Sequence, residues 1–119
     1  MKHHRKIRKF GRVRKQRTAL MQGLASSFFI TKRIRTTEAK AKSLRPFVER
    51  VITRGKNPTL ANRRLLRAQF SAATVAQIIA HAAELKDRAG GYTRVVKLGV
   101  RASDSARLAL LESVIYKSS

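Results

Sequence analysis

Apolar residues recur at helical spacing in four stretches of the chain. The first begins near Thr18 and places Leu20, Leu24 and Phe28 at four-residue steps, on one face of a helix. Phe28 and Phe29 continue this stripe, so we expect both in the core rather than stacked on bases. The other three stretches repeat the periodicity over residues 38–54, 58–70 and 72–87. The pattern therefore predicts four helices, each with one apolar face.

Residues that favour helix ends lie between these stretches. Thr37 is suited to cap the second helix, and Ser71 is suited to cap the fourth. Gly55 can adopt the left-handed conformation that ends the second helix. Asn57 and Pro58 then fit the cap and the first position of the third helix. These residues predict where each helix begins and ends.

Three stretches have the composition of β-strands. Residues 32–37 alternate and contain β-branched side chains, and residues 92–98 are rich in β-branched and aromatic ones. Residues 107–115 are apolar almost throughout, which favours a strand covered on both faces, with a C-terminal helix as the alternative. We expect an α+β domain over residues 18–115, in which about four helices cover a small mixed three-stranded sheet. Its last two strands would form an antiparallel hairpin, and residues 116–119 would form a short tail.

The charge of the chain is strongly one-sided. Lys and Arg number 28 against six Asp and Glu, so the formal net charge is +22 on 119 residues. Self-repulsion on this scale works against a compact monomer unless a polyanion neutralises it. The sequence has no cysteine and therefore no thiolate metal site, and no apolar run reaches the ~18 residues of a membrane span. No secretory signal is visible at the charged start, and we expect a cytoplasmic protein.

Residues 1–17 concentrate this charge, with nine Lys or Arg and no acid. Ordering a backbone costs about 1–2 kcal/mol per residue, and the few apolar groups here cannot offset that cost. We therefore expect an extended basic tail that is disordered in the free protein and ordered on a densely negative partner. Phe10 would either stack on an unpaired base or insert into an apolar crevice of the body or of a neighbouring protein. The candidate RNA-binding residues of the tail are Lys2, His3, Arg5, Lys6, Arg8, Lys9, Phe10, Arg12, Arg14, Lys15 and Arg17.

Further basic residues lie off the apolar stripes of the predicted domain. They would form a structured basic face that binds phosphates without reading base sequence. The alternative is that they are solvated faces with no partner. The residues are Arg35, then Lys40, Lys42 and Arg45 on the second helix, Arg63, Arg64 and Arg67 on the third, and Arg94, Lys97 and Arg101 in the hairpin.

Residues that could support catalysis or hold a metal do not form a recognisable set. His3 and His4 are adjacent and have no acid or cysteine near them in sequence. His81 stands alone on the fourth helix, where a surface or boundary position is expected. Asp104 is suited to cap its own loop, and Glu112 is suited to pair with an arginine. We therefore expect no enzymatic activity, no metal and no cofactor.

Two other classes of cationic protein share this composition. A DNA-compacting protein would be favoured by a dimerising apolar face or a helix-turn-helix, and neither is clear in the sequence. A membrane-active protein needs an amphipathic helix with its charges opposite large apolar side chains, and the densest basic segment lacks that face.

Several short segments form a specific combination. They are Arg12 with Arg17-Thr18-Ala19-Leu20, Ile34-Arg35-Thr36-Thr37, Lys40-Ala41-Lys42, Leu44-Arg45, Asn62-Arg63-Arg64, and Gly90-Gly91-Tyr92-Thr93-Arg94 with Lys97, Gly99 and Arg101. Together they resemble the bacterial large-subunit ribosomal proteins numbered seventeen, from Met1 to about Val114. The resemblance implies a structural component of the large ribosomal subunit that supports translation. It also implies binding to large-subunit ribosomal RNA near the nascent-chain exit, beside neighbouring ribosomal proteins.

Two positions depart from the pattern of that family. Ile7 stands where the family usually has a glycine, and Ser103 stands where a glycine is common in an Arg-x-Gly-Asp loop. Since glycine adopts a positive φ more readily than serine, we expect the loop around Ser103 to differ locally.

Overall fold

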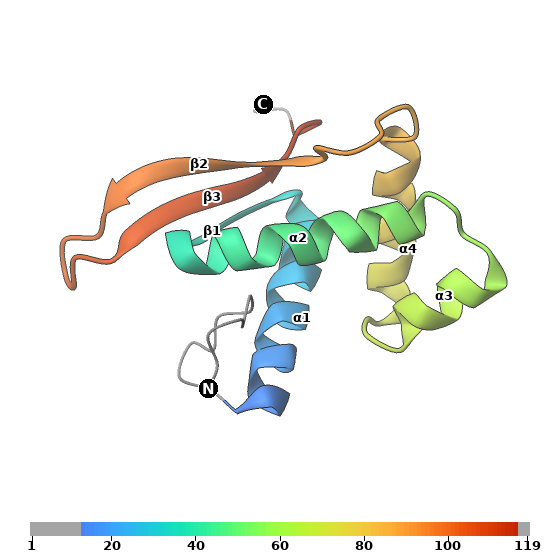
Figure 1. Ribbon diagram of the computed structural model, residues 1–119, viewed down its shortest axis with the longest axis horizontal. Helices are drawn as coiled ribbons and strands as arrows, with labels where there is room; N and C mark the ends of the chain where they lie inside the picture. Colours follow the sequence, from blue (N-terminus) through green and yellow to red (C-terminus); the bar gives the residue numbers. More distant parts are fainter. Residues whose placement is uncertain (1–12, 117–119) are drawn as a thin grey trace, which may run out of the picture.

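Seven elements follow one another along residues 13–116, the part of the chain that the computed structural model describes (Figure 1). The α+β class is confirmed, with four helices and three strands in this part of the chain. The elements are α1 (Arg14–Thr31), β1 (Arg33–Thr37), α2 (Glu38–Gly55), α3 (Leu60–Arg67), α4 (Ala72–Glu84), β2 (Thr93–Val100) and β3 (Arg107–Ser113).

The three strands form one sheet in the order β1-β3-β2. Ile34 on β1 and Val95 on β2 both pair with Leu111 on β3, and both pairings are antiparallel. The prediction of a mixed sheet is therefore wrong. The predicted antiparallel hairpin of β2 and β3 is confirmed. Residues 107–113 form a strand rather than the alternative helix. The register of the hairpin shifts once, between Lys97 and Gly99.

The helices lie on one side of the sheet, and α2 runs along it in contact with all three strands (Figure 1). Ala109 and Leu111 on β3 are fully buried on that side. Because side chains alternate along a strand, Leu108 and Leu110 face the opposite side, where they are half-buried. The prediction that the last strand is covered on both faces is therefore wrong for the described residues. One face of the sheet carries no helix from this part of the chain.

Aromatic side chains fill the centre of the core between α1 and α4. Phe28 and Phe29 are fully buried with their rings edge to face at 5.2 Å, as expected for core residues. Phe70 meets Phe29 at 6.4 Å between ring centroids. His81 lies 5.9 Å from both of the α1 phenylalanine rings and is fully buried. The expected surface or boundary position of His81 is therefore wrong.

His81 joins α4 to the end of β3. Its Nε2 lies 2.6 Å from the Ser113 hydroxyl, which is also buried, whereas Nδ1 has no hydrogen-bond partner among the described residues. Burial disfavours the charged imidazolium and, with a smaller effect from Lys32, lowers the pKa of His81 to about 4. The side chain therefore packs as a neutral ring at neutral pH.

Gly55 has a different role from the predicted one. It is the last residue of α2, it is buried, and its φ is not positive. A Cβ added at Gly55 would lie 3.0 Å from Ile78 Cγ2 and 3.2 Å from Ala82 Cβ on α4. Glycine therefore allows α2 and α4 to approach closely.

Two of the three predicted helix caps are confirmed. The hydroxyls of Thr37 and Ser71 accept hydrogen bonds from the first turns of α2 and α4. The third prediction is wrong, because α3 is capped by Thr59, which accepts from Asn62 N at 3.2 Å, and not by Asn57. In the loop after β2, Ser105 has a positive φ of 59° and Ser103 does not, in agreement with the expectation that Ser103 adopts this conformation less readily than glycine.

Candidate nucleic-acid interface

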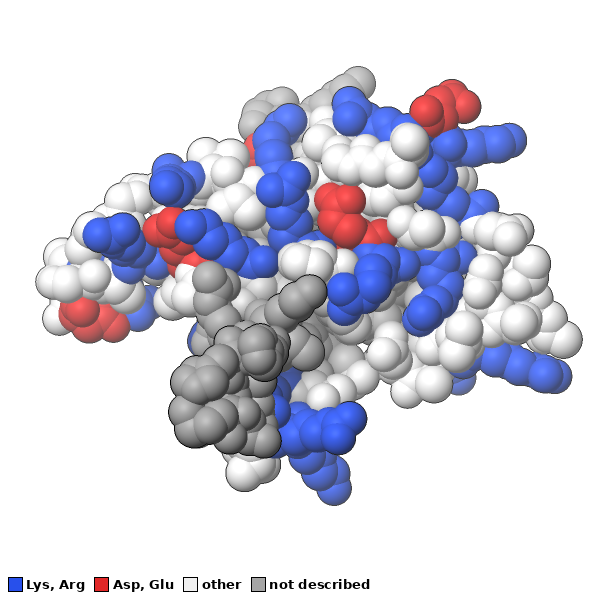
Figure 2. All heavy atoms as spheres, in the orientation of Figure 1, with Lys and Arg blue, Asp and Glu red and all other residues white. Residues whose placement is uncertain are grey.

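The six acidic residues leave two long parts of the chain without negative charge. Residues 1–37 contain 12 Lys or Arg and no acid, and residues 50–83 contain six Lys or Arg and no acid. Space-filling representation shows Lys and Arg spread over this side of the molecule, with acids only singly among them (Figure 2). The six cations of the second part are Arg50, Arg54, Lys56, Arg63, Arg64 and Arg67.

Helix α3 presents the three arginines that the sequence assigned to it. Its only buried side chain is Leu66, which anchors the helix on the core. Arg63 Nε donates to the Pro58 carbonyl at 3.0 Å, and Arg67 Nη1 donates to the Phe70 carbonyl at 3.2 Å. These acceptors are neutral, so they orient the guanidinium groups without cancelling their charge. Together with the exposed Arg64, they form a fixed cationic edge on α3.

The basic residues of α2 differ in how far they are neutralised. The apolar stripe of α2 is buried, as expected, and Arg45 lies exposed beside it. Among the described residues, Lys40 and Arg45 make no ion pair, whereas Lys42 Nζ lies 2.9 Å from Glu38 Oε1. Lys40 and Arg45 therefore remain available for a polyanion, and Lys42 is partly satisfied within the chain.

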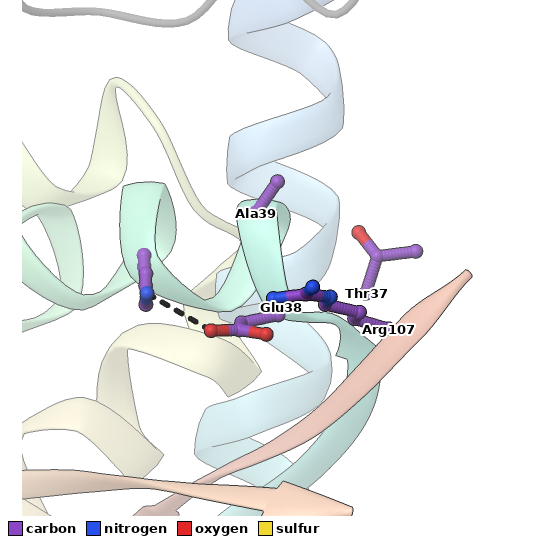
Figure 3. A pocket seen from close by; sticks show the side chains of 5 residues that line it. Thr37, Glu38, Ala39 and Arg107 are labelled. Atoms are coloured by element: carbon purple, nitrogen blue, oxygen red, sulfur yellow. Dashed lines mark ion pairs between the residues drawn. The ribbon is translucent and has the colours of Figure 1, made fainter. Parts of the chain in front are cut away.

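Glu38 lines a shallow hollow of about 320 Å³ at the start of α2, between the helix and β3. Figure 3 shows its carboxylate turned toward the Lys42 ammonium, with Arg107 beside them. Lys97 from β2 also approaches Glu38 Oε1, at 3.7 Å. The hydrogen bond from Lys42, helped by these neighbouring charges, lowers the pKa of Glu38. Lys42 and Lys97 are paired with this carboxylate, so the hollow offers less unpaired positive charge than α3 does.

Other hairpin cations are also paired within the chain. Arg94 Nε donates to Glu112 at 2.7 Å, which confirms that Glu112 pairs with an arginine. Arg101 makes a two-point contact with Asp104 at 2.9 and 2.8 Å, and this contact lowers the pKa of Asp104 to about 2. Asp104 also accepts from Ala106 N at 3.2 Å and so caps its own loop, as expected. The hairpin therefore offers less unpaired charge than α3.

The Gly-Gly-Tyr-Thr-Arg segment anchors the hairpin on α2. The carboxylate of Glu49 accepts from Tyr92 N at 3.3 Å, from Thr93 N at 2.9 Å and from Thr93 Oγ1 at 2.7 Å. Lys56, the residue directly after α2, donates from Nζ to the Tyr92 hydroxyl at 3.1 Å. Gly91 has a φ of +65°, which favours glycine at this turn. The segment therefore has a structural role in the folded chain.

The candidates chosen from sequence did not include some residues that contribute to the basic surface or hold the hairpin on α2. Glu49 could have been singled out because it is the only acid between Glu38 and Glu84. Arg50, Arg54 and Lys56 belong to a part of the chain without acids, and this absence of acids could have identified them as candidate RNA-binding residues.

The predicted site residues do not all lie together. Helix α3 and the tip of the hairpin lie at opposite ends of the molecule (Figure 1). Arg14, Lys15 and Arg17 are helical, because α1 begins four residues before the expected start at Thr18. Arg35 is exposed on β1. The other tail residues lie outside the described part of the chain: Lys2, His3, Arg5, Lys6, Arg8, Lys9, Phe10 and Arg12.

Residues 13–116 contain neither a membrane-spanning helix nor a metal-binding cluster. No helix there is long and apolar enough to cross a membrane. No group of three or more His, Cys, Asp or Glu there is arranged to hold a metal ion.

Comparison with known proteins gives a consistent result. A family model described as Ribosomal protein L17 matches residues 20–114. Proteins called Large ribosomal subunit protein bL17 are 45% identical over 118 residues in Salinibacter ruber, 44% over 116 in Sphingopyxis alaskensis and 42% over 118 in Desulfotalea psychrophila. These alignments cover 98%, 96% and 98% of this chain, and 60%, 84% and 92% of the relatives. The chain thus spans three-fifths of the length of the Salinibacter ruber protein. With a family match over most of its length and such relatives, the chain belongs to the ribosomal protein L17 family.

Proposed function

We propose that this chain is a structural constituent of the large ribosomal subunit and acts there by binding ribosomal RNA. Membership of a family of structural ribosomal proteins supports the role and supports the absence of enzymatic activity. The observation that carries RNA binding is the cationic edge of α3, within a part of the chain that has no acid between residues 50 and 83.

The chemistry of this edge suits phosphate binding. A cation that neutralises a phosphate releases a condensed counterion, so affinity depends strongly on salt. Arg63 and Arg67 are already oriented by backbone carbonyls, which reduces the side-chain entropy lost on binding. Such contacts position a protein on RNA and do not read base sequence. Arg45 and Lys40 on the N-terminal half of α2 are further cations without an ion pair among the described residues.

The basic N-terminal segment is part of the proposal. Its cations between Lys2 and Arg12 would follow the RNA backbone, and residues 1–12 would become ordered only in the complex, whereas Arg14, Lys15 and Arg17 lie on α1. Phe10 would stack on an unpaired base or insert into an apolar crevice. A location near the nascent-chain exit follows from the family resemblance, and footprinting of the full chain on large-subunit RNA tests it.

The decisive experiment compares two variants of the full chain that each lose three cations. One carries Arg63→Gln, Arg64→Gln and Arg67→Gln on α3, and the control carries Arg94→Gln, Lys97→Gln and Arg101→Gln in the hairpin. Binding to a large-subunit RNA fragment is measured between 50 and 200 mM salt. The slope of log affinity against log salt should weaken by roughly two to three for the α3 variant and by less than about one for the control. Equal changes in the two variants contradict the assignment to α3, and tighter binding of wild type to duplex DNA or anionic vesicles contradicts RNA as the partner.

A further inference from the structure

The face of the sheet opposite the helices is uncovered in the described part of the chain (Figure 1). The strand register places side chains on this outer face in rows across β1, β3 and β2. One row contains Arg33, Glu112 and Arg94, and the next contains Arg35, Leu110 and Val96. We use the term outer face for these two rows together with Leu108.

The charges of the first row are satisfied within the chain. Glu112 lies 2.7 Å from Arg94 Nε and 3.5 Å from Arg33 Nε. Arg33 also lies over the ring of Tyr116, at 5.0 Å from its centroid, and donates to its hydroxyl at 3.2 Å. The two guanidinium groups of this row therefore share one carboxylate and are already partly neutralised. The row therefore differs from α3, where arginines have only neutral acceptors.

The rest of the outer face is apolar at its centre. Leu108 and Leu110 are half-buried and Val96 is 38% exposed, without a covering element from the described residues. Along β2, Leu98 is 44% exposed, and it extends the apolar surface toward the hairpin tip. Arg35, at the β1 edge, makes no ion pair among the described residues. In Figure 2 the end of the molecule formed by the hairpin shows white and red atoms beside the blue ones.

We propose that the outer face docks a segment of a neighbouring large-subunit protein. The segment would be apolar where it meets Val96, Leu108 and Leu110, and it would carry a carboxylate toward Arg35. This inference rests on the proposed function, because it takes the large subunit as the place where the partner is met. It gives a role to a surface that the proposed RNA contacts do not use.

Three observations favour this partner over the alternatives. Aliphatic side chains gain free energy by burial against other apolar groups, and the ribose-phosphate backbone offers few of these. Arg33 and Arg94 already have a carboxylate partner in Glu112, so a phosphate group gains less from them than from the arginines of α3. A second copy of this chain is disfavoured by a formal charge of +22 on each molecule.

Site-directed photocrosslinking in assembled large subunits tests the proposal. A benzophenone amino acid is placed at Val96 on the outer face or, as the matched control, at the exposed Leu65 on α3. The Val96 probe should give an adduct with another ribosomal protein, and its crosslinked peptide should contain apolar residues flanked by Asp or Glu. The Leu65 probe should give an RNA adduct. An RNA adduct, an adduct with a second copy, or no adduct at Val96 overturns the inference. Failure of the Leu65 probe to reach RNA counts instead against the proposed function.

A second measurement distinguishes a protein partner from RNA by the direction in which occupancy of the large subunit changes. Val96→Lys adds a cation at an exposed position, as does Leu65→Lys on α3. Each variant competes with wild type for assembly into large subunits, and occupancy is measured by mass spectrometry. Val96→Lys should lose at least threefold in occupancy, because an ammonium group meets an apolar segment, whereas Leu65→Lys should retain or gain occupancy. An increase in occupancy for Val96→Lys overturns the inference.

Discussion

Single residues in this chain are constrained mainly by neighbours that are distant in sequence. Gly55 is the clearest case, since the atoms that exclude a side chain there belong to Ile78 and Ala82. Gly23, by contrast, lies inside α1 with nothing within 4 Å of an added Cβ. The sequence assigned Gly55 to a helix end, and only the packing of α2 on α4 shows why a side chain is excluded there.

This contrast gives a prediction on stability. Gly55→Ala should lower the free energy of unfolding by about 1–3 kcal/mol, because the added methyl overpacks the α2–α4 contact. Gly23→Ala should raise it by about 0.5–1 kcal/mol through helix propensity. Urea unfolding of both variants measures the difference. A Gly55→Ala protein as stable as the Gly23→Ala protein contradicts the close-approach argument.

His81 predicts a loss of stability in mild acid. Its pKa is about 4 in the folded chain and near 6.5 in the unfolded one. Between these values the unfolded state binds more protons, so stability falls as pH decreases. The loss between pH 7 and pH 5 should be about 2 kcal/mol. His81→Gln retains a donor for Ser113 and removes the titration, so its free energy of unfolding should change much less over that range. A pH dependence equal to that of wild type would exclude His81 as the cause.

At the scale of elements, the hairpin is attached to α2 through one carboxylate. Glu49→Gln weakens three hydrogen bonds, to Tyr92 N, Thr93 N and Thr93 Oγ1, and should destabilise the chain by about 1–3 kcal/mol. Glu84→Gln is the control, because its ion pair with Lys32 at 3.4 Å is exposed and should contribute less than about 1 kcal/mol. Hydrogen exchange should show faster opening near Thr93 in the first variant. Equal stability of the two variants argues against the anchor.

The elements themselves could largely be predicted from sequence, because periodicity and capping are local signals. Thr37 and Ser71 were identified as caps, and Phe28 and Phe29 as core. The burial of His81 could not be predicted, since it depends on Ser113, which is 32 residues away. The ion pairs that neutralise Lys97 and Arg94 depend on the register of strands distant in sequence. A list of cations from sequence therefore identifies candidates but does not distinguish those already paired from those available to RNA.

At the scale of the whole molecule, the distribution of charge predicts how the chain responds to RNA. The N-terminal residues before α1 combine many cations with little apolar surface, whereas residues from Arg14 onward contribute to one folded body. We expect amides of residues 2–12 to exchange freely in the free chain and to become protected on large-subunit RNA. Hydrogen exchange with and without RNA measures this. Protection of these amides before RNA is added would show the prediction wrong.

The order of strands also bears on how the chain is made. The central strand of the sheet, β3, is the last element in sequence, and β1 and β2 contact it but not each other. During synthesis from the N-terminus, neither β1 nor β2 has a partner strand until Arg107–Ser113 has emerged. The side of α2 that packs on β3 therefore stays uncovered until that point. A nascent chain that stops before Arg107 should hold helices without a sheet, so residues 107–113 decide whether the sheet forms.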